Sequence, residues 1–87
     1  MSKYEIQITD KVKKSLTSIN KEDRLRIQMA IDLLGENPRP PAAKKLQDSN
    51  YYRVRVGDYR IIYSIDDGKL IIQIIQAIHR REAYRNL

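Results

Sequence analysis

The chain has 87 residues, no cysteine and a net charge of +6. This length supports one hydrophobic core, so we expect a single domain over residues 1–87. Disulfides are excluded, and a membrane span is not expected because the apolar run Leu70–Ile78 is interrupted by Gln73 and Gln76. The chain shows no apolar leader, so we expect a cytoplasmic protein, and its positive charge favours anionic partners.

The chain begins with a predicted strand and a short helix. Residues 4–8 alternate apolar and polar side chains, which is typical of a half-buried strand. Thr9 can then cap a helix, because its hydroxyl can accept a backbone N–H of the first turn. The apolar positions of this helix are Val12, Leu16 and Ile19.

A second, longer helix is predicted to follow directly and to form an antiparallel hairpin with the first. Asn20 and Asp23 resemble a capping box at its start, and Gly35 is expected to end it. Its expected apolar positions are Leu25, Met29, Ala30, Leu33 and Leu34. The three prolines of residues 37–41 cannot continue a helix, so we expect a rigid connection there.

The second half of the chain predicts a meander of three strands. Residues 51–56 and 59–65 are joined by the turn signal Gly57-Asp58, and residues 69–79 are aliphatic enough for a central strand. We therefore expect an α+β fold of order β-α-α-β-β-β, with the helical hairpin packed on a small, mainly antiparallel sheet that the first strand joins. A short helical turn is expected at residues 81–86.

Arginines alternate with apolar residues on these strands. Arg53 and Arg55 should leave one strand face about 7 Å apart, and the turn should bring Arg60 close to them. Arg80, after the last strand, could complete the group. Guanidinium groups bind phosphate oxygens through paired donors, so this pattern predicts a phosphate-binding surface. The alternative is a solvated face whose arginines pair with Asp58, Asp66 or Asp67.

Two further side chains could take part in chemistry. His79 has the intrinsic pKa of a general acid or base, although a lone histidine at a strand end is commonly structural. Tyr84 lies among arginines and could stack on a base or orient a hydroxyl, or it could cover the sheet edge. With one histidine, no cysteine and no clustered carboxylates, neither a metal site nor a cofactor is expected.

The motifs YRVRVGDYRIIY and HRREAYR, in this order of elements, resemble the RelE/ParE superfamily of toxins from toxin-antitoxin systems, and the RelE branch most. The resemblance spans essentially the whole chain. It implies a RelE-like fold and a metal-independent endoribonuclease that cleaves mRNA, typically on the ribosome, with the RNA 2′-hydroxyl as nucleophile. Such activity would inhibit translation.

The resemblance gives family counterparts to Arg53, Arg55, Arg60, Arg80 and Tyr84, and other candidates come from the chemistry of the side chains themselves. The catalytic candidates are Arg53, Arg55, Arg60, Arg80, Tyr84 and His79, and the candidates for RNA binding are Lys44, Lys45, Arg81 and Arg85. The family pattern has lysines where this chain has Arg53 and Arg55. Because arginine gives up a proton far less readily than lysine, Tyr84 or His79 is expected to act as the base.

Two other activities stay open at this point. The chain could be a ParE-like toxin that inhibits DNA gyrase, or a non-catalytic basic RNA-binding member of the family. Either kind of toxin needs an inhibitor, so we expect an acidic, RelB-like antitoxin that forms a hetero-oligomeric complex with the chain. The other expected partners are mRNA and the ribosome.

Overall fold

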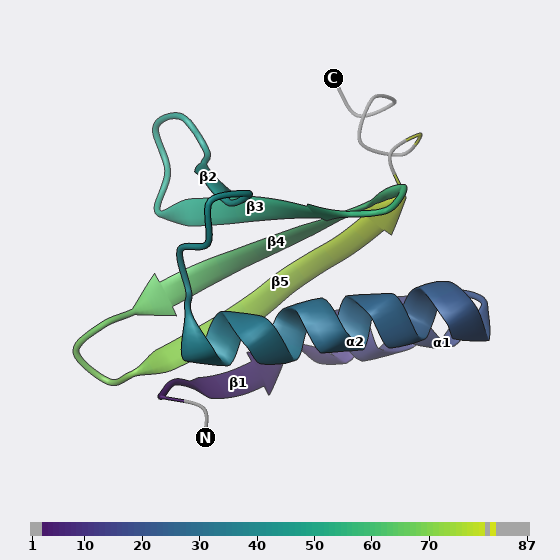
Figure 1. The fold of residues 1–87 in the computed structure, drawn as a ribbon, viewed down its shortest axis with the longest axis horizontal. Coiled ribbons are helices and arrows are strands. Elements are labelled where there is room, and N and C mark those ends of the chain that lie inside the picture. Colours follow the sequence, from purple (N-terminus) through teal and green to yellow (C-terminus); the bar gives the residue numbers. More distant parts are fainter. Residues whose placement is uncertain (1–2, 80, 82–87) are drawn as a thin grey trace.

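The computed structural model describes residues 3–79 and 81 of the chain. They form a five-stranded sheet and two helices (Figure 1). In chain order the elements are β1 (Glu5–Ile8), α1 (Asp10–Thr17), α2 (Lys21–Glu36), β2 (Lys44–Lys45), β3 (Tyr51–Val56), β4 (Tyr59–Asp66) and β5 (Ile71–His79).

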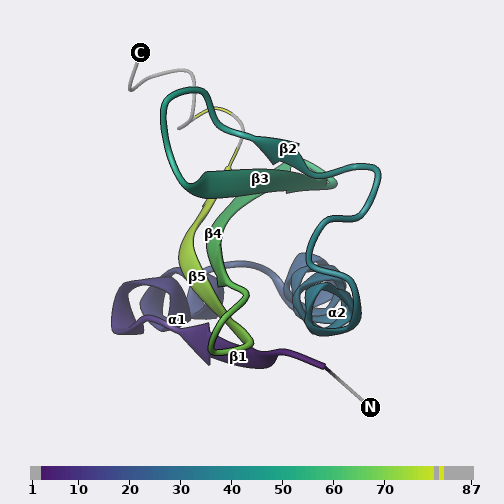
Figure 2. The ribbon, with the colours of Figure 1, turned by 90° about the vertical axis from the view of Figure 1, so that its left-hand side faces the viewer.

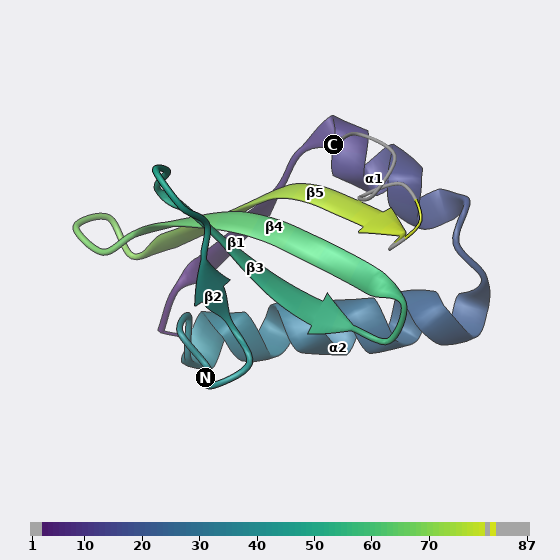
Figure 3. The same ribbon diagram turned by 90° about the horizontal axis from the view of Figure 1, so that it is seen from above.

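The strands follow the order β1-β5-β4-β3-β2 across the sheet. β1 pairs in parallel with β5, and the other neighbours are antiparallel. A parallel pair needs a crossover, which α1 and α2 belong to. Both helices lie behind the strands when the sheet is seen from above (Figure 3). The predicted α+β fold is confirmed, with β2 as an additional edge strand.

Both predicted helix starts are confirmed by side-chain caps. The Thr9 hydroxyl accepts a hydrogen bond from the Val12 N–H at 3.3 Å. Asn20 Oδ1 accepts one from the Asp23 N–H at 2.9 Å, and the Asn20 amide donates to the Asp23 carboxylate at 2.9 Å. These contacts satisfy backbone donors that have no partner inside the helix. The second helix ends at Glu36, one residue beyond the predicted Gly35.

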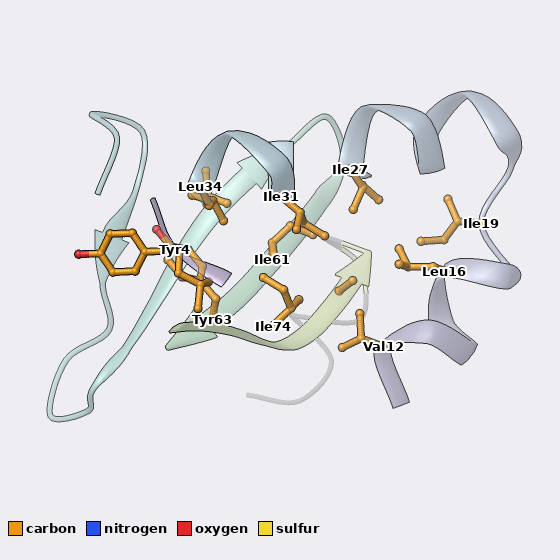
Figure 4. Close-up of a cluster of buried hydrophobic side chains, with 13 residues drawn as sticks. Tyr4, Val12, Leu16, Ile19, Ile27, Ile31, Leu34, Ile61, Tyr63 and Ile74 are labelled. Atoms are coloured by element: carbon orange, nitrogen blue, oxygen red, sulfur yellow. The ribbon is translucent and has the colours of Figure 1, made fainter. Parts of the chain in front are cut away.

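The core-facing side of α2 differs from the prediction. Ile27, Ile31 and Leu34 point toward the strands and are almost fully buried (Figure 4). Three of the predicted apolar positions are exposed instead, namely Leu25, Met29 and Leu33. The helix carries two apolar stripes at helical spacing, on opposite sides, and the sheet can cover only one of them. Of the predicted large apolar residues, Leu34 alone lies on the covered side.

The inner face of the sheet completes the core. Ile61, Tyr63, Ile72 and Ile74 are fully buried beneath the helices. The hydroxyl of Tyr63 donates to the carbonyl of Pro38 at 2.7 Å, which attaches the linker after α2 to β4. Burial, followed by the neighbouring Tyr52, raises the pKa of Tyr63 to about 12, so this hydroxyl keeps its proton.

The sheet is strongly twisted, as an end-on view shows (Figure 2). Gly57 supports the tight connection from β3 to β4 with φ of +59°, a left-handed conformation that glycine adopts without the steric cost of a Cβ atom. This two-residue turn sets which residues of β3 and β4 lie opposite each other.

Candidate nucleic-acid interface

Strand alternation directs the arginines of β3 away from the helices. Val54 is buried on the helix side, whereas Arg55 is exposed and Arg53 is half-buried. Because successive side chains of a strand point to opposite faces, Arg53 and Arg55 share the outer face at a spacing of about 7 Å. The predicted division of this strand into a basic and an apolar side is confirmed.

Arg60 joins these arginines through the register of the hairpin. Arg55 lies directly opposite Arg60, and Arg53 lies opposite Ile62. Ile61 is fully buried beneath the helices, which places its neighbour Arg60 on the outer face. Directly opposed residues of an antiparallel pair have Cβ atoms about 5 Å apart. The two guanidinium groups of Arg55 and Arg60 therefore leave neighbouring positions on one surface.

β2 adds a further cation to this surface. Lys44 lies opposite Arg53, and Lys45 lies opposite Tyr52. Lys44 thus shares the outer face with the arginines, whereas Lys45 alternates to the other side. Figure 3 looks down on the outer side of the sheet, with the helices behind it. We call the following residues the basic face: Lys44, Arg53, Arg55 and Arg60.

The basic face carries an electrostatic cost. Like charges directly opposite each other on a sheet are destabilising, and this applies to Lys44 with Arg53 and to Arg55 with Arg60. Within the described part of the chain, Lys44, Arg53 and Arg55 form no ion pair with a carboxylate. Such an array is suited to an anion with several negative groups at regular spacing, as a nucleic-acid backbone has.

His79 lies on the other side of the sheet from the basic face. It is opposite Tyr59 in the β4–β5 register, and the two rings meet edge to face with centroids 5.2 Å apart. Both rings line a cavity of about 310 Å³ together with Ser15, Ser18 and Ile19, at the end of α1. The structure therefore does not bring His79 together with the arginines of the sheet.

The remaining predicted site residues belong to the C-terminal segment. Arg80, Tyr84 and Arg85 lie outside the described residues, as does the predicted helical turn apart from Arg81. Arg81 is exposed, and its N–H donates to Nδ1 of His79 at 3.2 Å. This hydrogen bond joins Arg81 to the last residue of β5.

A polar cluster around Asp67 escaped the sequence analysis. Arg39 Nη2 and the Asp67 carboxylate form an ion pair at 2.9 Å, and the Tyr4 hydroxyl donates to the same carboxylate at 2.7 Å. Arg39 Nε also donates to the hydroxyl of Tyr52 at 3.2 Å. Asp67 is thus engaged by the linker arginine and not by an arginine of the basic face. The cluster attaches the segment before β2 to the β4–β5 turn and to β3.

The contacts of this cluster shift the ionisation of its members. Hydrogen bonds from Arg39, and then from Tyr4, lower the pKa of Asp67. The hydrogen bond to Asp67 raises the pKa of Tyr4, with burial adding to the shift. The hydrogen bond to Asp67 also raises the pKa of Arg39. Around neutral pH the cluster therefore holds a carboxylate, a guanidinium and a neutral phenol.

Neither a metal site nor a membrane-spanning helix is found among the described residues. Within residues 3–79 and 81, no group of three or more histidine, cysteine or acidic side chains could hold a metal ion. In the same part of the chain, no helix is both long enough and apolar enough to cross a membrane.

The chain matches the family model described as the ParE toxin of type II toxin-antitoxin systems over residues 6–84. The protein belongs to the RelE/ParE superfamily of toxins. A relative in this superfamily, a RelE1 toxin candidate of Methanocaldococcus jannaschii, is 34% identical over 90 residues, which cover 97% of this chain and 98% of the relative. The resemblance seen in the arginine and tyrosine motifs is therefore confirmed at the level of the family.

Solved RelE structures share the fold of this toxin. The archaeal RelE–RelB complex from Pyrococcus horikoshii OT3 matches with a TM-score of 0.82 and 32% identity, covering 90% of this chain and 96% of the other. The RelB–RelE antitoxin–toxin complex from Methanococcus jannaschii matches with a TM-score of 0.71 and 26% identity, covering 93% and 98%. The predicted RelE-like fold is confirmed by both matches.

Proposed function

We propose that the chain is the toxin of a RelBE-type system and acts as an endoribonuclease that cleaves mRNA on the ribosome. The observation that carries this proposal is the basic face. The register of the β3–β4 hairpin puts Arg60 opposite Arg55, and the short edge strand β2 puts Lys44 opposite Arg53, so cations from three strands lie on one surface. The superfamily membership and the RelE-like fold support it.

The proposed reaction needs no metal ion, as the resemblance implies. The RNA 2′-oxygen attacks the adjacent phosphorus, a new O–P bond forms, and the bond from phosphorus to the 5′-oxygen breaks. A base takes the proton of the 2′-hydroxyl, and the leaving 5′-oxygen takes a proton from a water molecule. Arg55 and Arg60 would bind the phosphate oxygens and stabilise the charge that develops in the transition state, because guanidinium groups stay charged throughout.

The base in this reaction is assigned to Tyr84 and not to His79. Tyr84 matches the near-terminal tyrosine of the family pattern and Arg80 matches the arginine after its last strand, and we propose that both act at the scissile phosphate. His79 faces the cavity beside α1, on the opposite side of the sheet from the basic face. The arginines are poor proton acceptors at neutral pH. In this proposal Lys44 and Arg53 contact neighbouring phosphates and so fix the position of the RNA on the protein.

The proposed partners follow from the family and from charge. RelE proteins that resemble this chain form complexes with RelB antitoxins. We expect a RelB-like antitoxin with an acidic segment that covers the basic face and competes with mRNA. The toxin and antitoxin would then form a hetero-oligomer in the cytoplasm.

The test is an mRNA cleavage assay on programmed ribosomes. The wild-type chain should cut the mRNA, and the triple variant Arg53→Gln, Arg55→Gln, Arg60→Gln should lose activity by about 100-fold or more. A matched control removes three exposed cations from α1 instead, with Lys11→Gln, Lys13→Gln and Lys14→Gln. This control should cleave at nearly the wild-type rate, although it carries the same loss of charge.

Three results would contradict the proposal. Intact mRNA with the wild-type chain and altered DNA supercoiling in cells would identify a gyrase inhibitor. Salt-sensitive RNA binding without cleaved product would identify a non-catalytic binding protein. Equal loss of cleavage in the α1 control would show that net charge, and not the basic face, carries the activity.

A further inference from the structure

Tyr51, the first residue of β3, presents an aromatic side chain to solvent. The residue is 43% exposed. Side chains two residues apart on a strand leave the same face at intervals of about 7 Å, so Tyr51 continues the row that Arg53 and Arg55 form. The outer face of β3 therefore carries one aromatic ring and two guanidinium groups in a line.

The other tyrosines of the described residues use their side chains in contacts within the fold. The hydroxyls of Tyr4 and Tyr63 donate hydrogen bonds. Tyr52 stacks on Tyr63, and Tyr59 meets a histidine ring edge to face. Within the same part of the chain, the side chain of Tyr51 makes neither a hydrogen bond nor a ring contact. Its exposed ring is therefore available to a partner outside the chain.

Hydrogen bonds of the preceding loop hold the backbone of Tyr51. Its N–H donates to Ser49 Oγ at 3.2 Å, and its carbonyl accepts the Leu46 N–H at 2.9 Å. The Ser49 hydroxyl donates to the Leu46 carbonyl at 3.2 Å, which closes the loop of residues 46–50 on itself. A ring carried by backbone that is already fixed loses less conformational freedom when a ligand binds.

The surroundings of the ring leave room for a flat ligand. Ser64 lies opposite Tyr51 on β4, and its side chain is too short to cover the ring. The loop of residues 46–50 rises from the sheet on the side away from the helices (Figure 1). It lines a hollow of about 530 Å³, to which the exposed residues Asp48 and Asn50 contribute a carboxylate and an amide. Such groups can form hydrogen bonds with the edge of a nucleobase.

We propose that Tyr51 is a stacking platform for one unpaired base of the bound RNA, with the loop of residues 46–50 beside the edge of that base. This inference rests on the proposed function, which supplies single-stranded RNA as the ligand. Proteins bind single-stranded RNA by stacking bases on aromatic side chains while cations contact the backbone, and Lys44 and Arg53 lie next to Tyr51 for the second task. Tyr51 is four residues, or about 13 Å, from Arg55, so the stacked base belongs to a nucleotide outside the scissile bond.

The test measures RNA binding by variants of the full chain. The probe is a short oligoadenylate with 2′-O-methyl groups, which cannot be cleaved because its nucleophile is blocked. Tyr51→Ala should raise the dissociation constant about fivefold or more, and Tyr51→Leu, which keeps an apolar side chain without the ring, should raise it as well. Tyr51→Phe keeps the ring and should stay within about twofold of wild type. Met29→Ala, which removes an exposed apolar side chain from α2, is the matched control and should also stay within about twofold.

A second probe with the same backbone and no bases separates stacking from charge. Tyr51→Ala should bind this abasic probe as tightly as the wild-type chain does. Arg53→Gln should weaken the binding of both probes, because it removes a phosphate contact. For the oligoadenylate, the slope of log affinity against log salt should be unchanged in Tyr51→Ala and smaller in Arg53→Gln.

The outcomes separate this inference from the proposed function. Wild-type affinity of Tyr51→Ala for the oligoadenylate would overturn the inference, and so would an equal loss with the abasic probe or failure of the wild-type chain to bind RNA. Weaker binding of a co-purifying antitoxin by Tyr51→Ala, with RNA binding unchanged, would assign the ring to that partner and also overturn it. A wild-type chain that binds RNA through Tyr51 and leaves mRNA intact on ribosomes would refute the proposed function alone.

Discussion

Arg55 and Arg60 lie directly opposite each other on β3 and β4, next to the turn that joins the two strands. Two like charges in this position oppose folding, so the pair is expected to cost stability while it serves anion binding. Arg55→Thr should leave the free energy of unfolding unchanged or raise it by about 0.5 kcal/mol, because threonine suits a strand and removes the repulsion.

The same substitution should impair cleavage of mRNA. Thermal unfolding and the ribosome cleavage assay, carried out on one preparation, give both quantities. We expect equal or higher stability with impaired cleavage. An Arg55→Thr chain that is less stable and fully active would contradict both expectations and exclude Arg55 from the site.

Lys44 and Lys45 provide a matched test of the outer face as the RNA-binding side. Lys44 shares this face with Arg53, whereas its neighbour Lys45 is opposite Tyr52 on the other side. Lys44→Gln should reduce the slope of log affinity against log salt by about 0.7 for single-stranded RNA, since one phosphate contact is lost. Lys45→Gln should change the slope less. Fluorescence anisotropy over a salt series measures both, and equal effects would argue against a defined binding face.

The buried hydroxyl of Tyr63 is expected to stabilise the fold through the linker. Tyr63→Phe removes the hydrogen bond to the Pro38 carbonyl and leaves that acceptor without its partner. The free energy of unfolding should fall by about 1–3 kcal/mol in urea titrations. Tyr51→Phe, at a position that is 43% exposed, serves as the control and should change stability by less than about 0.5 kcal/mol. Similar values for the two variants would contradict the assigned role of Tyr63.

The cluster of Arg39, Asp67 and Tyr4 should make stability depend on pH. The pKa of Asp67 is lowered in the folded chain, so the folded state favours the carboxylate. The resulting stabilisation is fully present above the ordinary carboxyl pKa of about 4 and is lost as pH falls through the lowered value.

Asp67→Asn should therefore unfold at a lower temperature than wild type at neutral pH, and the difference should shrink below about pH 4. Asp58→Asn, in the β3–β4 turn, is the control and should show no such convergence. A difference in melting temperature that is constant from pH 7 to pH 2 would show that the ion pair does not contribute.

The two apolar sides of α2 should differ sharply in their effect on stability. Ile31 is 2% exposed, and Ile31→Ala should cost about 2–5 kcal/mol because it removes buried methyl groups and leaves a cavity. Leu33→Ala, at 62% exposure, should cost less than about 0.5 kcal/mol. Urea titrations of the two variants test the assignment. Comparable losses would mean that the exposed side of α2, which carries Leu33, is also part of the core.

Local patterns in the sequence determined the elements and the faces of the strands. The period of two in residues 51–56 separated Arg53 and Arg55 from Val54, and the capping residues Thr9 and Asn20 set the helix starts. These features depend on neighbours within a few residues, so the sequence alone reports them. The family resemblance rested on the same local motifs.

Tertiary structure decided what depends on distant contacts. α2 has two apolar stripes, and only packing against the sheet selects Ile31 over Met29 for burial. His79 could face either side of β5 until the register with β4 placed it beside Tyr59. The hydrogen bond between the Tyr4 hydroxyl and the Asp67 carboxylate joins residues 63 positions apart, and local sequence patterns do not predict a contact over this separation. The basic face depends on both. The turn signal at Gly57-Asp58 predicted that Arg60 joins Arg53 and Arg55, whereas Lys44 reaches this surface only because β2 pairs with β3.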